Sequence, residues 1–487
     1  MSKVWRLAVF AAAAIPGTAL ADAAQTPAAN APSFKLPSNV AVDVSGGAAN
    51  PDGSGLQGRT SLAIQTAAGD AKLSGTFTAT PSGPTQPDDQ TARKLGLDSK
   101  LKGPAGVTLS INAGSQIQDT RQNGVLVPTG LAATSATTEQ NMASASATAH
   151  PLANVGVTTG IRQSRTITAQ DNQPLAGARQ SNTVTADDRQ IYANADWTPV
   201  PALSINAGAK SEEMRVSSHG LGDGADQYRF AEPSASAIAR PWTGAQVKVS
   251  SEDAVSPVNP YDFAALAQAA GPDSDLHIAP NREWRNQASV SQTLDGGGML
   301  SASVTQARVE SATELGLTPD GATAPVSISG GARSQLDASV SMPLSGIGLP
   351  GTTISSQATL RRSQIRDPIT GETRRLSGEI PREASVKLAH KDDARRLEWG
   401  VTGNLATEQS FYQPAQVTSL RTGSGVGAFV TYNPGRYVVS LNANCLIGGA
   451  RSQTSDIYLG NRTGNIEATT RTGDSSPLVS LSVSQKF

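Results

Sequence analysis

The chain has 487 residues, of which 38% are hydrophobic and 47 are glycine, with a single cysteine and a formal net charge of -1. One cysteine excludes a disulfide-stapled scaffold, and the balanced charge gives no support to nucleic-acid binding. This composition is unusual for a water-soluble globular protein. It fits a transmembrane β-barrel, in which only alternate residues must be apolar.

The N-terminus has the pattern of a secretory signal. Lys3 and Arg6 precede an apolar run at 7–15, and small residues follow up to Ala21. The pattern predicts a signal peptide over residues 1–21, with cleavage after Ala21. Residues 22–36, rich in Ala and Pro, are predicted to be a disordered lead. No later window approaches the roughly 18 uninterrupted apolar residues of a spanning helix. A membrane protein with this sequence must therefore be a barrel.

Alternating segments joined by short turns recur from residue 100 onward. Residues 191–197 alternate apolar and polar side chains, a Pro-containing turn follows at 198–201, and 203–210 alternate again. Such a unit is a β-hairpin with one apolar and one polar face. The same unit recurs at 288–290 with 300–304, 336–342 with 354–360, 384–388 with 397–401, and 426–432 with 437–443.

Short and long connections alternate along the chain. The long ones are rich in Ser, Thr, Asn, Asp and Gly and lie near 119–140, 167–187, 255–283, 312–332 and 451–475. We therefore predict an all-β fold, a large antiparallel transmembrane β-barrel over residues 37–487 with short periplasmic turns and long extracellular loops. Counting from a first strand near Val40–Val44 gives about 16–20 strands, the lower number staying open because the N-terminal third alternates only in patches. Trp197, Trp242 and Trp399 lie near short turns, where an interfacial girdle is expected.

The longest loop contains a predicted helix. Asp262 is a candidate N-cap, Phe263 and Leu266 belong to the apolar run that follows, and Gly271-Pro272 ends it. These apolar residues do not suit free exposure to water. We predict that the segment folds into the pore as a constriction, with packing over the mouth as the alternative.

The last strand carries the most specific pattern. Val479, Leu481, Val483 and Phe487 share one face, serines occupy the other, and the chain stops on the aromatic residue. This strand resembles the closing strand of Gram-negative outer-membrane β-barrels, whose C-terminal signal is read by the barrel-assembly machinery. The resemblance implies a location in the cell outer membrane, contact with its lipid, and assembly by that machinery.

No motif for catalysis or cofactor binding is visible. The four histidines, at 150, 219, 277 and 390, are widely separated, and no pair has metal-ligand spacing. Hydrolase-elbow, P-loop and dinucleotide fingerprints do not occur in a strand–helix context. We predict no catalytic residue, no metal site and no cofactor, and a protein that is not an enzyme.

The polar faces of the predicted hairpins carry both signs of charge. The candidate lumen-lining charges are Asp196, Lys210, Asp337, Arg361, Lys387 and Glu398. No single-sign stripe is present, so strong ion selectivity does not follow. This lumen suggests an outer-membrane channel, or porin, for passive diffusion of small hydrophilic solutes.

Two alternatives to the channel remain at this point. One is a barrel that exports a polysaccharide or another polymer with a periplasmic partner, and the other is a structural or adhesive surface β-protein. A first strand near residue 40 leaves no room for an N-terminal plug, which disfavours an energy-coupled receptor with a plugged lumen.

Deletion of Phe487 is expected to impair membrane assembly, because it removes the terminal aromatic residue of the assembly signal. The variant should accumulate in the periplasm or be degraded, as immunoblots of fractionated cells would reveal. Normal outer-membrane levels of the variant would count heavily against a barrel.

Overall fold

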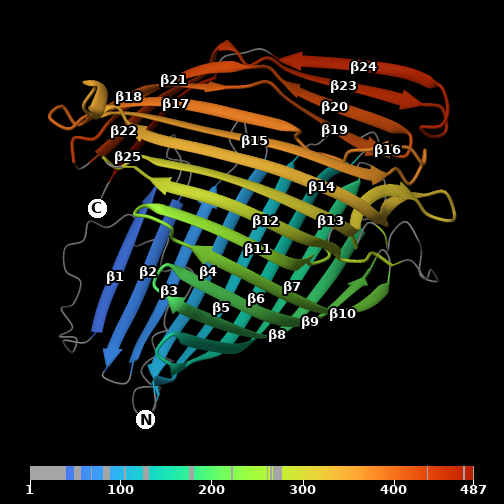
Figure 1. Ribbon diagram of the computed structural model, residues 1–487. Coiled ribbons are helices and arrows are strands. Elements are labelled where there is room, and N and C mark those ends of the chain that lie inside the picture. The colour runs from blue at the N-terminus through green and yellow to red at the C-terminus, as the bar shows by residue number, and fades with distance from the viewer. Residues whose placement is uncertain are drawn as a thin grey trace, which may run out of the picture.

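The computed structural model consists mainly of antiparallel strands (Figure 1). It describes residues 40–48, 56–66, 69–80, 88–103, 106–123, 131–174, 180–220, 223–259, 262–263, 266, 277–294, 296–435, 437–474 and 478–485. The predicted signal peptide, the predicted lead and Phe487 lie outside these residues. In the described parts of the chain, no helix is long and apolar enough to cross a membrane.

Strands β1 to β15 follow one another around a curved wall, each paired antiparallel with the next. A 3-10 turn, η2 (Ser345–Ile347), lies in the short connection between β14 and β15. The bounds are β1 (Val40–Ala48), β2 (Leu56–Thr66), β3 (Gly69–Thr80), β4 (Asp88–Lys102), β5 (Thr108–Asn123), β6 (Leu131–Leu152), β7 (Val155–Pro174), β8 (Gln180–Val200), β9 (Leu203–His219), β10 (Gly224–Ala239), β11 (Ala245–Ser256), β12 (Asn281–Thr293), β13 (Met299–Leu317), β14 (Thr323–Pro343) and β15 (Thr352–Arg366).

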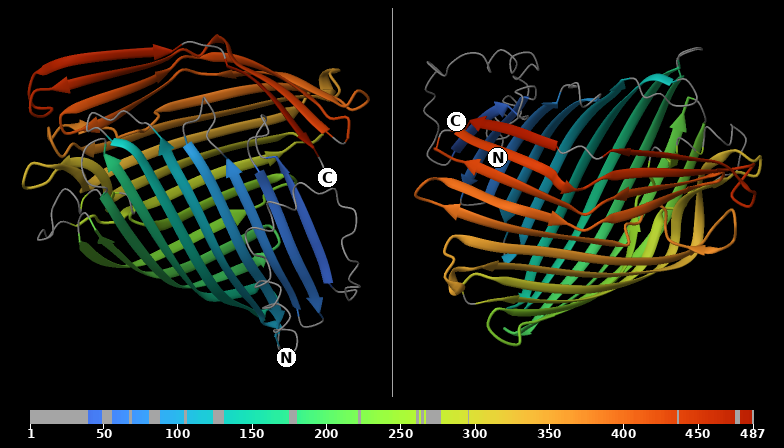
Figure 2. Two further views of the ribbon diagram at one scale, coloured as in Figure 1. Left: turned by 180° about the vertical axis from the view of Figure 1, so that it is seen from behind. Right: turned by 90° about the horizontal axis from the view of Figure 1, so that it is seen from above.

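The C-terminal strands complete the wall. They are β16 (Thr373–Arg374), β17 (Arg382–Asp392), β18 (Leu397–Asn404), β21 (Gly425–Tyr432), β22 (Tyr437–Gly448) and β25 (Leu478–Gln485). With them the described residues form one 21-stranded sheet, which includes the two-residue β16. β25 comes back beside β1 (Figure 2), although no ladder joins these two strands in the described residues.

A second, four-stranded sheet extends the wall at one end. It consists of β19 (Thr407–Gln413), β20 (Gln416–Thr422), β23 (Arg451–Tyr458) and β24 (Ile466–Asp474). In the chain these strands directly adjoin β18, β21, β22 and β25, respectively. The sheet projects beyond the wall at the end that carries the long connections, in red and orange at the upper right of Figure 1.

The two faces of the wall differ as the alternation predicts. Residues directly opposite each other in an antiparallel ladder share a face. Leu388 opposes Val401, which in turn opposes Ala428, and Val430 opposes Leu441. The large apolar side chains of this face, such as those of Val401 and Leu441, are exposed. An exposed apolar band around such a wall is the lipid-facing surface of a barrel. We call the opposite, polar side the inner face.

The predicted hairpins are confirmed by their registers. Ala195 opposes Ala207 across the turn near residue 200, and Leu336 opposes Leu360 in the β14–β15 pair. The predicted fold class, a large antiparallel barrel, is confirmed. Without the two-residue β16, the strand number reaches the upper end of the expected range. The reason is that the N-terminal third, where the alternation is patchy, forms the full strands β2, β3 and β4.

Four of the segments predicted to be long loops are mainly strand. The β5–β6, β7–β8, β13–β14 and β23–β24 hairpins run through most of 119–140, 167–187, 312–332 and 451–475. The prediction was wrong because it relied on apolar alternation, and a strand needs an apolar face only where it meets lipid or a core. Beyond the membrane, Thr- and Ser-rich strands are held by ladder hydrogen bonds that leave no such pattern.

The apolar band predicts a difference between two neighbouring residues of β18. Val401→Arg is expected to destabilise the barrel by about 2–4 kcal/mol, because a charged side chain then faces the hydrocarbon. Thr402→Arg, on the inner face opposite Lys387, should change the free energy of unfolding far less. Urea unfolding of both variants in lipid vesicles tests this, and equal destabilisation would contradict the assignment of faces.

Candidate functional site

The inner face of β8, β9 and β10 carries a cluster of buried charges. The ammonium group of Lys210 on β9 lies 2.7 Å from a carboxylate oxygen of Glu212 and 2.9 Å from one of Glu232 on β10. Both carboxylate side chains are almost fully buried, at 1% and 5% exposure. Lys210 opposes Glu232 on β10, and Asp188 on β8 neighbours Glu212, so the three adjacent strands bring the cluster together.

This arrangement constrains the wall electrostatically. A buried carboxylate is costly unless it is paired. Lys210 is shared between two carboxylates, so its ammonium group holds β9 and β10 in one geometry.

The connection between β11 and β12 packs onto the same strands. Phe263 and Leu266, both helical, are buried at 4% and 3% exposure. They belong to one apolar cluster with residues of the inner face and with both ends of the connection: Val184, Met214, Val216, Val258, Ile278 and Ala324. The described residues of this connection thus form part of a core at this end of the barrel, which we call the mouth.

Hydrogen bonds hold the second end of this connection on two sides. The hydroxyl group of Tyr228 on β10 donates to the carbonyl oxygen of Ile278, at 2.6 Å. The amide of Ala279 donates to the hydroxyl oxygen of Ser327 on β14, at 2.7 Å. His277 contacts the carboxylate of Asp226, also on β10. The connection is therefore fixed to β10 and to β14 across the intervening strands.

A second buried charge network lies where β15 ends. Asp367 pairs with Arg374, whose guanidinium group also lies 3.0 Å from Glu314 on β13. Arg462, from the β23–β24 connection of the four-stranded sheet, lies 2.7 Å from Asp367. All four side chains are buried, at 8% exposure or less. We call this network the latch.

The latch holds Asp367 in its charged form. Burial alone would raise the pKa of this carboxyl group, but hydrogen bonds from Arg374, the Thr370 amide and Arg462 outweigh burial and lower the pKa to about 2. A lowered pKa stabilises the folded state above the ordinary carboxyl pKa of 3.8, and this contribution disappears as the pH falls through about 2. Asp367 is therefore charged in the folded protein, and its contribution to stability is fully present, above about pH 4.

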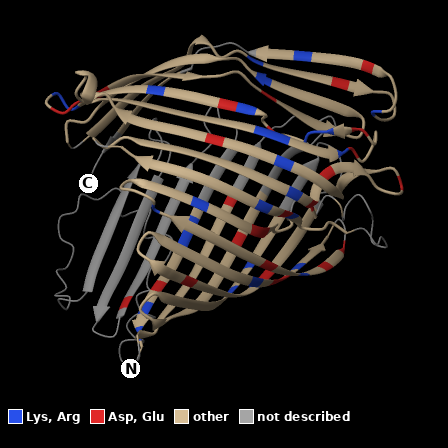
Figure 3. Cartoon of the chain, viewed as in Figure 1, with Lys and Arg blue, Asp and Glu red and all other residues tan. Residues whose placement is uncertain are grey.

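Both signs of charge are interspersed on the strands (Figure 3). The six predicted lumen charges all have polar or charged partners. Asp196 accepts a hydrogen bond from Asn206, Asp337 from Gln335 and Thr359, Arg361 pairs with Glu383, and Lys387 pairs with Glu398. Lys210 belongs to the buried cluster described above. That these residues line a solute path stays a prediction.

Two of the predicted constriction residues pack against the wall. Phe263 and Leu266 pack against Met214 and its neighbours on the inner face, and burial also raises the pKa of Asp262. Residues 264–265 and 267–276 lie outside the described part of the chain. That the segment narrows the pore stays a prediction.

Val479, Leu481 and Val483 of the last strand pair with β22. Their role in assembly also stays a prediction.

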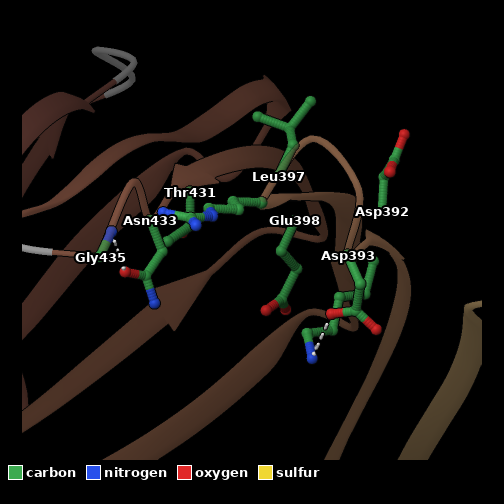
Figure 4. Close-up of a pocket in the computed structure, with 9 residues that line it drawn as sticks. Asp392, Asp393, Leu397, Glu398, Thr431, Asn433 and Gly435 are labelled. Carbon is green, nitrogen blue, oxygen red and sulfur yellow. Dashed lines mark hydrogen bonds and ion pairs between the residues drawn. The ribbon is translucent and has the colours of Figure 1, made fainter.

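A small charged hollow lies at the opposite end of the wall (Figure 4). It measures about 440 Å³ and lies between the β17–β18 and β21–β22 turns, lined by Lys391, Asp393, Glu398 and Asn433 among others. Lys391 and Asp393 form an ion pair of 2.8 Å, but both side chains are mostly exposed. Exposed pairs contribute little binding energy. In the described residues, no group of three or more potential ligands could hold a metal ion.

Sequence reasoning missed the two buried charge networks. Lys210 and Glu212 could have been noticed together, because residues two apart on a strand share a face. Asp367 and Arg462 are 95 residues apart, and no local pattern connects them.

No protein-family model and no curated protein sequence matches the chain. Solved structures share its fold. An iron transporter, FrpB, from Neisseria meningitidis (F5-1 variant, apoprotein form) is similar with a TM-score of 0.64 and 12% identity, over 89% of this chain and 71% of that one. The ferric-catecholate import receptor Fiu from Escherichia coli K12 gives 0.65 and 12%, over 92% and 77%. The ferric yersiniabactin uptake receptor FyuA from Yersinia pestis gives 0.64 and 11%, over 92% and 74%.

The fold is thus that of large outer-membrane β-barrels, which confirms the predicted barrel and its location in the outer membrane. The prediction of a passive diffusion channel is wrong, because the structures that share this fold are named as an iron transporter and as import and uptake receptors. The polymer-exporter and adhesin alternatives are set aside for the same reason. The argument against a receptor from the early first strand is set aside as well, because structures of the same fold are named as receptors.

Replacement of Lys210 is expected to destabilise the wall. Lys210→Met should cost about 3–5 kcal/mol, because it leaves the carboxylates of Glu212 and Glu232 buried without a cation. The triple variant that adds Glu212→Gln and Glu232→Gln should recover most of that loss. Urea unfolding in lipid vesicles measures both, and a Lys210→Met variant as stable as the parent would contradict the role of the cluster.

Proposed function

We propose that this protein is an outer-membrane receptor that takes up a small ligand selectively. The similarity to import receptors supports the class of protein. The observation that carries the proposal is the ordered mouth: Phe263 and Leu266, from the β11–β12 connection, are buried in a core on the inner face. The β23–β24 connection is likewise held by the buried latch.

A mouth whose connections are held in a fixed conformation favours recognition of a ligand over free diffusion. A binding surface that is already ordered loses less conformational entropy when a ligand arrives. Two separate networks, one apolar and one ionic, order the connections at this end. A pore that only excludes large solutes gains nothing from such order.

The ligand class follows by analogy. FrpB is named as an iron transporter, Fiu as a ferric-catecholate import receptor and FyuA as a ferric yersiniabactin uptake receptor. We propose a small metal chelate as the ligand here. The many Ser, Thr, Asn and Gln side chains of the inner face, with charges of both signs, can hydrogen-bond to a polar chelate.

Saturable uptake is the expected property that distinguishes a receptor from a pore. Cells that lack their own ferric-chelate receptors and express the full chain should take up at least one of a panel of ⁵⁵Fe-labelled chelates. The rate should level off as the chelate concentration rises, and an excess of the same unlabelled complex should suppress it. Cells expressing the chain without Phe487 serve as the control for surface assembly.

A linear dependence of rate on concentration for every chelate, with no competition, would contradict the proposal. Linear flux is the behaviour of diffusion, because a pore without a binding site does not saturate.

A further inference from the structure

The four-stranded sheet is separated from the wall along one line. β18 and β19 are interrupted at Leu405–Ala406, β20 and β21 at Gly423–Ser424, and β22 and β23 at Gly449–Ala450. These three interruptions are neighbours, because the strands on either side of them are neighbours in their sheets. We call the four-stranded sheet and its connections the flap.

The interruptions form a line about which the strands can bend. The amide of Gly423 donates to the carbonyl oxygen of Ala450, and the amide of Gly449 donates to that of Ser424, both at 2.7 Å. These bonds run between neighbouring strands, along the line, so that bending about the line leaves them intact. Hinges in proteins are a few such residues at the ends of elements.

Glycines make this line possible. Gly448 and Gly449 have φ angles of 73° and 76°, which residues other than glycine rarely adopt. A Cβ atom at Gly448 would lie 2.1 Å from the carbonyl oxygen of Ser424, and one at Gly449 would lie 2.4 Å from the sulfur of Cys445. The backbone therefore turns sharply here without strain.

The far end of the flap is held by the latch. Arg462, in the β23–β24 connection, pairs with Asp367 of the wall and also donates to the carbonyl oxygen of Gln413 at 2.6 Å. Arg374 and Arg462 lie over the ring of Tyr412 at 4.2 and 5.5 Å from its centroid. The Tyr412 amide donates to the hydroxyl oxygen of Ser377, at 3.0 Å.

We propose that the flap is a hinged part of the mouth that bends at the Gly423–Gly449 line and is held in its present position by the Arg462–Asp367 pair. The geometry alone supports the hinge and the latch. We also expect release of the flap to admit the ligand, and this part rests on the function proposed above. Strand segments joined in this way move on a timescale of about microseconds to milliseconds.

Distances between spin labels test the hinge without any ligand. The full chain in lipid nanodiscs, with Cys445→Ser, carries labels at Leu459→Cys on the flap and Asp320→Cys on the β13–β14 turn, both exposed positions. The parent should give one narrow distance distribution. Asp367→Asn and Arg462→Met, made separately, should each add a second population at longer distance that becomes the major one.

The matched control breaks a different ion pair on the neighbouring strand. Glu383→Gln removes the partner of Arg361, at 3.3 Å, and should leave the distribution narrow. Heat-dependent mobility in SDS verifies that each variant is folded. A narrow, unshifted distribution in both latch variants, once folded, overturns the hinge, whatever the uptake assay shows. A shift without any saturable uptake would keep the hinge and reject the proposed function.

Discussion

The structure depends on one constraint, which is that backbone polar groups in a membrane must find their partners within the protein. The antiparallel ladders from β1 around to β25 meet this need strand by strand. Alternation then follows, because each spanning strand must offer lipid an apolar side chain at every second position. The other positions are free to be polar, and they give the inner face its mixture of hydroxyl, amide and charged groups.

Beyond the membrane the same ladders continue, but burial there follows a different rule. The β11–β12 connection buries Phe263 and Leu266 against Met214 and Val216, which lie on the inner face. The latch buries Asp367 between Arg374 and Arg462. Both arrangements order the mouth, and the proposed receptor function rests on this order.

Alternation made the hairpins predictable from sequence. The pairing of Leu388 with Val401 and of Val430 with Leu441 could be read from the sequence because the turns fix the register and lipid requires the pattern. The strand extensions beyond the membrane could not, since no apolar face is needed there. The pairing of Asp367 with Arg462 could not be predicted from the sequence, because only the folded chain brings these residues together.

Function was the weakest sequence-based inference, for a physical reason. A polar inner face suits a diffusion pore and a receptor equally, and composition does not separate them. The receptor function proposed above rests instead on the arrangement of the connections at one end of the barrel. That arrangement depends on contacts such as Tyr228 with Ile278, 50 residues apart, which are invisible before folding.

Direct binding to the purified, folded protein tests the central claim of selective recognition most directly. Titration of the full chain in nanodiscs with a panel of ferric chelates, followed by isothermal calorimetry, should show saturable binding of at least one chelate and none of the metal-free form of an unrelated chelator. Absence of saturable binding for every chelate, with a barrel that keeps its heat-dependent mobility, would contradict a receptor for this class of ligand.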